Sequence, residues 1–513
     1  MLIVADDLGY SDVGAFGGEI QTPNLDRLAA EGRLLTDHHT AATCSPTRAM
    51  LLSGSDHHLV GLGSMAELLS PNQVGKPGYE GYLNERSLSI AQLLLDSGYH
   101  TYIAGKWHLG TTEERSPKAW GFESSFVLVN GASSHFAPDP KRPTSFDRGV
   151  YRQDGKVTSV PADFFSTNFY TDKLIGYIEA QHGDGKPFFA FAAFTAPHWP
   201  LQAPDADLER YRGRYDGGYE AIRSARLARQ QQLGIIPSDL RASPGQPDSA
   251  ANPRWHKLNA EQQRLEARRM EVYAAMVDNL DRNVGRLLAT LQELGVYEDT
   301  FIFFQSDNGA EAEPTRFRDN EHIDNHYENL GRPFSNVAYG RRWAEVSATP
   351  FRLWKGTSGE GGVLVPAIAR LPRQAAGGAA FRGVSHVSDL APTFLALAGA
   401  PNPGSRYRER EVHPITGVSL LPALRGGAPP READSLLSDE LFGRRYVRRG
   451  AWKLSFIEPP LGTGAWELYN LESDRGETKD LAREQPELVR ELSREFDAYA
   501  ARVKLVLPSQ PGF

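Results

Sequence analysis

Short apolar runs that end in polar residues recur along this chain of 513 residues. A continuous apolar run of this kind is typical of a strand that is buried on both faces of a sheet. Polar residues that can bind a metal ion or move a proton follow each run directly. The pattern predicts four such strands, at residues 2–5, 99–104, 187–195 and 300–305.

Segments with a helical period of about 3.6 residues separate these runs. Helices are predicted at 22–32, 45–54, 87–95, 171–181, 270–294, 386–398 and 486–503. Residues 136–165 and 311–350 carry no sustained period and are predicted to be loops. Alternating strands and helices predict an α/β fold with a large, mixed, mostly parallel sheet and helices on both faces.

The chain is predicted to divide into two domains. Residues 1–425 would form the catalytic domain, and residues 426–513 a small domain with an antiparallel sheet and a closing helix. Residues 400–433 are rich in proline, glycine and arginine, which is typical of a linker. The strands of the small domain are predicted at 446–447, 452–456 and 466–469.

Composition and charge argue against some classes of binding partner. The formal net charge of −8 argues against a surface for nucleic acid or an anionic membrane. The longest apolar run, Phe188 to Phe194, is too short to span a bilayer. No signal peptide is visible before Asp6, and a single cysteine suits a reducing compartment. The chain is therefore predicted to be cytoplasmic.

The single cysteine opens the segment Cys44-Ser45-Pro46-Thr47-Arg48. Ser45 suits a helix N-cap and Pro46 the first helical position, so Cys44 would lie where free amide groups favour an anion. Arg48 lies one turn further on, near enough to hold a group that Cys44 carries. Taken alone, a half-buried thiol beside a capped helix explains the same segment.

Two acidic pairs follow the first and the fourth predicted strand. Asp6-Asp7 and Asp307-Asn308 offer three carboxylates and an amide oxygen, which are hard ligands suited to Ca²⁺ or Mg²⁺. In isolation each pair is an ordinary turn or loop signal. At one sheet edge, however, these carboxylates would repel one another strongly without a cation. The sequence therefore predicts a divalent cation site.

Four further side chains stand at similar places. Lys106 and His108 follow the second strand, and on an extended segment both would face the same side. His198 follows the third strand in a proline-rich turn, and Lys355 precedes a glycine-rich turn. Each has an ordinary alternative as a solvated lysine or a packed histidine.

Cys-x-Pro-x-Arg resembles the signature of the type I sulfatases. Other motifs of that family follow in the family's order: Asp6-Asp7, Gly105-Lys106-Trp107-His108-Leu109-Gly110, Ala196-Pro197-His198-Trp199-Pro200, Asp307-Asn308-Gly309 and Lys355. The resemblance covers residues 1 to about 370 and resumes at Tyr446. It is strongest to soluble bacterial arylsulfatases, which share Asp56-His57-His58.

The resemblance implies an alkaline-phosphatase-like fold and hydrolysis of sulfate monoesters, above all aryl sulfates. It implies that a formylglycine-generating enzyme oxidises Cys44 to Cα-formylglycine, whose hydrate attacks sulfur and is transiently sulfated. It also implies a calcium ion held by Asp6, Asp7, Asp307 and Asn308 with an oxygen of residue 44. Asp307 would in addition assist the attack.

The remaining roles follow from the same resemblance. Lys106 and Lys355 would bind the sulfate oxygens, and His198 with Lys355 would assist departure of the alcohol or phenol oxygen. His108 would take the proton whose removal expels sulfate, and Arg48 would orient the diol.

Alternatives remain beside this interpretation. They are an alkyl sulfatase, a phosphonate monoester or phosphodiester hydrolase with the same aldehyde, and a non-catalytic sulfate-binding relative. Leu52-Ser53-Gly54-Ser55 departs from the family's usual Leu-Thr-Gly-Arg, which bears on the conversion of Cys44. The walls of a pocket for a small sulfate ester are predicted from loops near 57–82, 132–150, 199–204 and 311–350. His57, Met65 and Trp199 are candidate lining residues, and packing in the interior is at least as good an explanation for each.

Overall fold

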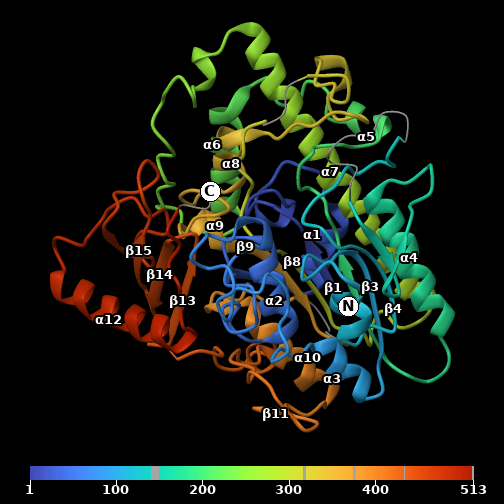
Figure 1. The fold of residues 1–513 in the computed structure, drawn as a ribbon. Helices are drawn as coiled ribbons and strands as arrows, with labels where there is room; N and C mark the ends of the chain where they lie inside the picture. Colours follow the sequence, from blue (N-terminus) through green and yellow to red (C-terminus); the bar gives the residue numbers. More distant parts are fainter. Residues whose placement is uncertain (140–148, 316–318, 374–376, 433, 511–513) are drawn as a thin grey trace.

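The computed structural model describes residues 1–139, 149–315, 319–373, 377–432 and 434–510 (Figure 1). Its α-helices are α1 (Pro23–Glu31), α2 (Cys44–Ser53), α3 (Ile90–Asp96), α4 (Ser166–Gln181), α5 (Asp205–Glu209), α6 (Gly218–Gln232), α7 (Ala260–Glu293), α8 (Gly340–Ser347), α9 (Glu360–Val363), α10 (Leu390–Ala398), α11 (Leu421–Leu424) and α12 (Pro486–Val503). Its strands are β1 (Leu2–Ala5), β2 (Arg33–His39), β3 (His100–Lys106), β4 (Ser124–Leu128), β5 (Tyr151–Gln153), β6 (Lys156–Thr158), β7 (Phe188–Ala193), β8 (Ile302–Ser306), β9 (Leu364–Arg370), β10 (Ser385–His386), β11 (Arg406–Tyr407), β12 (Arg410–Glu411), β13 (Leu436–Leu441), β14 (Arg444–Arg449), β15 (Trp452–Phe456) and β16 (Trp466–Asn470).

Ten of the described strands form the central sheet, in the order β10-β2-β9-β8-β1-β7-β3-β4-β5-β6. From β8 to β4 each strand runs parallel to its neighbour. β9 runs antiparallel to both β8 and β2, and β5 and β6 form an antiparallel hairpin at the far edge. The predicted mixed, mostly parallel sheet is confirmed.

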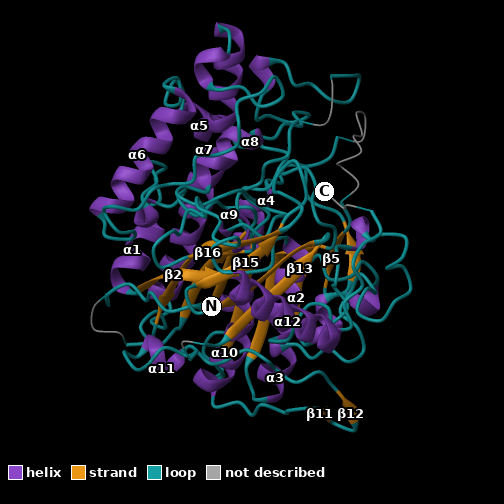
Figure 2. Ribbon diagram, turned by 90° about the vertical axis from the view of Figure 1, so that its left-hand side faces the viewer, coloured by secondary structure: helices purple, strands orange, loops and turns teal. Residues whose placement is uncertain are grey.

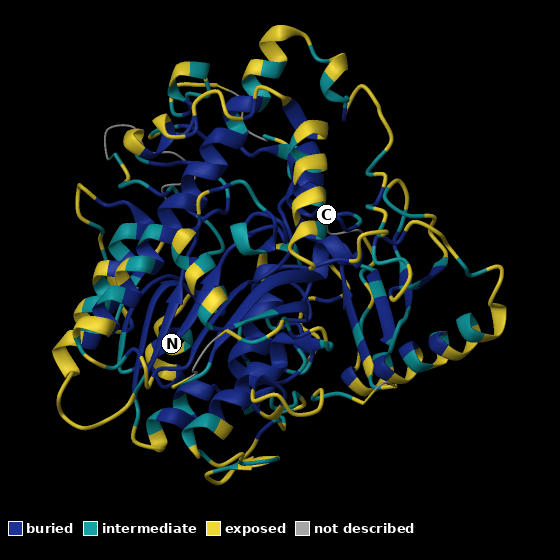
Figure 3. Cartoon of the chain, turned by 180° about the vertical axis from the view of Figure 1, so that it is seen from behind, coloured by how far each residue is buried: buried dark blue, intermediate teal, exposed yellow. Residues whose placement is uncertain are grey.

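The central sheet is buried on both faces because side chains alternate along each strand. In β1, Ile3 and Ala5 belong to the core cluster that contains α1, α4 and α7. Leu2 and Val4 belong to a second cluster, which contains α2, α3 and α10. Figure 2 shows helices on both sides of the strands, and Figure 3 shows the sheet as the buried centre of the molecule.

The four strands predicted from apolar runs are neighbours in the sheet, in the order β8-β1-β7-β3. Their carboxyl ends therefore lie side by side. Backbone hydrogen bonds continue the pairing past the strand ends, because Asp6 N donates to Ala196 O at 3.0 Å and Asp307 N donates to Ala5 O at 3.0 Å. The polar residues after these strands are thus held at one edge.

A second, four-stranded antiparallel sheet, β13-β14-β15-β16, lies beside the large one near the C-terminus (Figure 1). Leu492 and Phe496 of α12 pack on Val447, Leu454 and Leu468 of this sheet. The predicted strands and closing helix are confirmed, whereas β13 was not predicted. The domain division at residue 425 stays a prediction.

Several predicted boundaries were wrong. The predicted loop at 136–165 contains β5 and β6, and the predicted loop at 311–350 contains α8. Strands of three residues are too short to show a period, which explains the first error. Helix α2 begins at Cys44 itself with Thr43 as its N-cap, so Ser45 is not the cap. No helix among the described residues has both the length and the apolar character needed to cross a membrane.

Candidate active site

Asp6 and Asp7 leave the carboxyl end of β1 and form the floor of the site. Asp7 has a φ of +68°, so the chain turns sharply there and both carboxylates stay beneath the loops that follow β7 and β8. The Asp7 amide donates to Asp307 Oδ1 at 3.3 Å, and Asn308 Nδ2 donates to Asp7 Oδ1 at 2.7 Å. The two acidic pairs, about 300 residues apart in sequence, therefore meet as predicted.

Cys44 lies directly above this floor, at the first position of α2. Its Sγ donates to Asp6 Oδ1 at 3.3 Å and lies 3.9 Å from Asp7 Oδ1. Burial raises the pKa of the Cys44 thiol well above its usual value, and the charges of Asp307 and Asp6 raise it further. The unmodified thiol therefore stays protonated at neutral pH and is a weak nucleophile.

Three buried cations hold the carboxylates in place. Lys106 Nζ donates to Asp6 Oδ2 at 2.7 Å. Arg48 Nε donates to Asp307 Oδ2 at 2.9 Å, and its Nη1 donates to the backbone oxygen of Lys106 at 3.0 Å. Lys355 Nζ lies 2.8 Å from Asp7 Oδ1. Burial would raise the pKa of Asp6, but Lys106, Arg48 and Lys355 hold it below its usual value.

Negative charge exceeds positive charge in this cluster. Glu311 joins the three aspartates, with its Oε2 at 3.0 Å from Lys355 Nζ, so four carboxylates face three cations. Burial raises the pKa of Asp7 well above its usual value despite Lys355, and the neighbouring carboxylates add to this effect. Another positive charge would therefore stabilise the site.

Ligand atoms for that charge are already in place. One ligand atom each of Asp6, Asp7, Cys44 and His198 lies within 4.8 Å of all the others. The buried Oδ1 of Asn308 has no hydrogen-bond partner among the described residues. Hard oxygen donors, an excess of negative charge and an unpaired buried oxygen are the features that a divalent cation such as Ca²⁺ fits.

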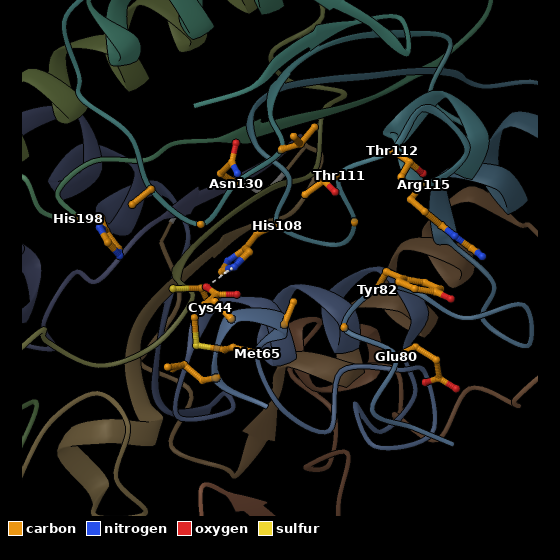
Figure 4. A pocket seen from close by; sticks show the side chains of 18 of the residues that line it. Cys44, Met65, Glu80, Tyr82, His108, Thr111, Thr112, Arg115, Asn130 and His198 are labelled. Carbon is orange, nitrogen blue, oxygen red and sulfur yellow. Dashed lines mark hydrogen bonds and ion pairs between the residues drawn. The ribbon is translucent and has the colours of Figure 1, made fainter. Parts of the chain in front are cut away.

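Two histidines stand above the floor, in the wall of a cavity (Figure 4). His198 Nε2 lies 3.5 Å from Asp7 Oδ2, and its Nδ1 donates to the Trp199 carbonyl at 2.5 Å. Burial lowers the pKa of His198 well below its usual value, as do the charges of Lys355 and Lys106. His198 is therefore neutral in the free site.

Lys106 and His108 were predicted to face the same side, but they do not. The prediction assumed an extended chain, but His108 has a φ of +58°. Lys106 consequently lies at the floor, while His108 lines the cavity wall and its Nε2 lies 3.0 Å from Glu67 Oε1.

The cavity has a volume of about 1220 Å³ and reaches from Cys44 to the surface. Met65 and Trp199 line it as predicted, together with Tyr82 and Lys355. His57 does not line it, because its Nε2 is bound by Asp439 Oδ1 at 2.6 Å in a buried position. Part of the predicted wall, residues 140–148 and 316–318, lies outside the described residues.

Two carboxylates of the site were not predicted from the sequence. Glu67 contacts His108, and Glu311 contacts Lys355. The only sequence signal for Glu311 is its position three residues after Asn308 in the same loop, and Glu67 has none.

Comparisons with known proteins show the family and the fold of the chain. A family model described as Sulfatase matches residues 1–400. The chain is 41% identical over 527 residues to an uncharacterized sulfatase of Schizosaccharomyces pombe, covering 99% of this chain and 94% of that one. It is 37% identical over 427 residues to an arylsulfatase of Klebsiella aerogenes, covering 82% and 90%. The crystal structure of Ps i-CgsB in complex with k-i-k-neocarrahexaose has the same fold, with a TM-score of 0.71, 24% identity and coverage of 100% and 94%.

Proposed function

The chain belongs to the sulfatase family, has its alkaline-phosphatase-like fold and is a sulfuric ester hydrolase, and from this premise we propose that it hydrolyses sulfate monoesters of phenols. The observation that carries the proposal is the position of Cys44. Its Sγ lies at the floor of the cavity, next to Asp6, with Lys355 and two histidines in the same cavity wall. A sulfate group that enters the cavity would reach residue 44 between cationic side chains.

We propose that Cys44 is converted to formylglycine by a formylglycine-generating enzyme. A protonated, buried thiol is a weak nucleophile, and neither cysteine nor serine has a second hydroxyl group for elimination. A hydrated aldehyde at residue 44 supplies one hydroxyl group for attack on sulfur and a second whose proton is removed when sulfate is released. The position of residue 44 beside the floor carboxylates supports this role.

Asp6, Asp7, Asp307 and Asn308 would hold a calcium ion, together with an oxygen of residue 44. When bound, the ion would polarise the sulfate group and stabilise the negative charge that develops on its oxygens. The excess of carboxylates and the unpaired Asn308 Oδ1 support this assignment.

The other side chains of the site would bind sulfate and move protons. Lys106 and Lys355 would share their positive charges between the floor carboxylates and the sulfate oxygens. His198 is neutral in the free site, and a bound sulfate would offset the lysine charges that disfavour its protonation. His198 could then assist departure of the phenol oxygen with Lys355, while His108 would accept the proton lost from residue 44.

The preference for phenols rests on the cavity wall. Tyr82 and Trp199 offer aromatic surface, and Met65 offers a polarisable apolar contact in the same cavity as Cys44. Such a wall fits an aromatic leaving group better than a hydrated sugar.

Turnover of three matched substrates tests the proposal: 4-nitrophenyl sulfate, an alkyl sulfate and a phenyl phosphonate monoester, each with converted enzyme. We expect kcat/KM to be highest for the aryl sulfate. Faster turnover of the alkyl sulfate would overturn the aryl preference. Much faster turnover of the phosphonate ester would show that the chain's main reaction is phosphonate ester hydrolysis.

A further inference from the structure

Glu67 and His108 form a carboxylate–imidazole pair in the wall of the cavity above Cys44. Glu67 lies in a short 3₁₀ helix, Ala66–Leu68, and His108 follows β3. His108 Nε2 lies 3.0 Å from Glu67 Oε1. The other ring nitrogen of His108, Nδ1, is buried and has no hydrogen-bond partner among the described residues. One nitrogen of the ring is therefore occupied and the other is available.

The ionised state of Glu67 is firmly set. Burial would raise the pKa of the Glu67 carboxyl group, but the charge and hydrogen bond of His108 lower it to about 2. Glu67 is consequently a carboxylate at any pH at which the enzyme would work. A carboxylate only accepts hydrogen bonds, so His108 must place a proton on Nε2 to bind it.

The backbone at Gly131 lies close to the pair. A Cβ atom at this position would lie 2.6 Å from His108 Cε1, 2.8 Å from Nε2 and 3.1 Å from Glu67 Oε1. A side chain at this position would therefore have to displace the imidazole ring or the carboxylate. Glycine at 131 leaves the space that the pair occupies.

We propose that Glu67 is a positioning residue for His108. Its carboxylate accepts the Nε2 proton, which fixes the tautomer and leaves the lone pair on Nδ1. Nδ1 is then the nitrogen that can accept the proton released from residue 44. This role rests on the proposed function, in which His108 takes that proton. The arrangement resembles other carboxylate–histidine pairs, in which the carboxylate orients the histidine without touching the substrate.

A role in substrate binding alone would give different kinetics. Glu67 lines the cavity and its side chain is 48% exposed, so loss of a substrate contact would raise KM and leave kcat unchanged. Loss of a positioning contact would lower kcat, because the base would then adopt the wrong tautomer or orientation. The two parameters therefore separate the two roles.

The kinetic experiment compares Glu67→Ala, Glu67→Gln and Gly131→Ala with the unchanged enzyme on 4-nitrophenyl sulfate. We expect Glu67→Ala to lower kcat by roughly 10- to 100-fold with little change in KM. Glu67→Gln keeps an oxygen that can accept from Nε2 and should lose only a few-fold. Gly131→Ala disturbs the same pair from its other side and should resemble Glu67→Ala. Glu113→Ala removes an exposed glutamate paired with Lys156 and is the matched control.

A spectroscopic measurement tests the pairing without any turnover. Long-range ¹H–¹⁵N spectra of histidine-labelled protein with unconverted Cys44 report the His108 tautomer, and the signal is assigned by its loss in His108→Gln. We expect the proton on Nε2 in the unchanged protein and a mixture of tautomers in Glu67→Ala.

A proton on Nδ1 in the unchanged protein, or an unchanged kcat in Glu67→Ala, would overturn the inference. If the unchanged, converted enzyme hydrolyses no sulfate ester at all, the proposed function fails instead. The tautomer would then still show whether the pair exists.

Discussion

Two buried clusters of charged residues differ in how completely their charges are paired. The floor cluster lies beneath the cavity and consists of Asp6, Asp7, Asp307, Glu311, Arg48, Lys106 and Lys355. The junction cluster joins the large sheet to the small one and consists of Asp37, Glu360, Glu477, Arg448, Lys453 and Arg475. Both contain carboxylates whose ligand atoms lie close enough to hold a metal ion.

The junction cluster is balanced. Arg448 binds Asp37 through both Nη atoms, at 3.0 and 2.9 Å. Lys453 Nζ lies 2.6 Å from Glu360 Oε1 and 3.0 Å from Glu477 Oε1. With Arg475, three cations face three carboxylates.

The floor cluster is not balanced, and this is what the comparison teaches. It has one more carboxylate than cations, an unpaired amide oxygen at Asn308, and a cavity above it. Proximity of ligand atoms alone does not separate the two clusters, because both satisfy it. An excess of carboxylates over cations beside a cavity marks the reactive cluster, and equal numbers of carboxylates and cations mark the structural one.

Replacement of Cys44, which lies directly above the floor cluster, should have the largest effect. Cys44→Ala removes the proposed nucleophile, so sulfate ester hydrolysis should fall by about 10⁴-fold or more. The melting temperature should change little, since alanine fills the start of α2 equally well. Retention of activity within ten-fold of the unchanged enzyme would show that residue 44 is not the nucleophile.

Lys453→Met should have the next largest effect, on stability instead of chemistry. It leaves Glu360 and Glu477 buried without their shared cation, which should cost about 3–5 kcal/mol in the free energy of unfolding. Chemical denaturation measures this loss. The kcat of the folded variant should be unchanged, and a large fall in kcat would contradict the structural assignment of the junction cluster.

Removal of divalent cations should have the smallest of the three effects. Dialysis against a chelator should lower sulfatase activity by about 100-fold or more, and added Ca²⁺ should restore it. Metal analysis should find one equivalent of calcium per chain, since the floor cluster has more carboxylates than cations and the junction cluster does not. Two equivalents of calcium per chain, or full activity without metal, would contradict the proposed difference between the two clusters.

Much of the fold and the floor of the site could be predicted from the sequence. Apolar runs identified β1, β3, β7 and β8, and polar residues at their ends identified the acidic pairs. Neighbouring parallel strands necessarily bring such ends together, so Asp6 and Asp307 could be placed side by side without coordinates. The short strands β5 and β6 could not be predicted, because three residues show no period.

The contacts of loop residues could not be predicted either. The sequence left two roles open for His57, pocket lining and packing, because its partner Asp439 is 382 residues away in sequence and belongs to the unpredicted strand β13. Glu67 and Glu311 carry no local pattern that separates them from solvated glutamates. Their role depends on which cation or imidazole the fold places next to them, and a sequence pattern does not contain that information.

The mass of the peptide that contains residue 44, measured on active enzyme, tests the central claim most directly. We predict a fraction about 18 Da lighter than the cysteine peptide, as expected for an aldehyde in place of a thiol. The kcat of different preparations should rise in proportion to this fraction. A fully active preparation in which residue 44 is entirely unmodified cysteine would contradict the account.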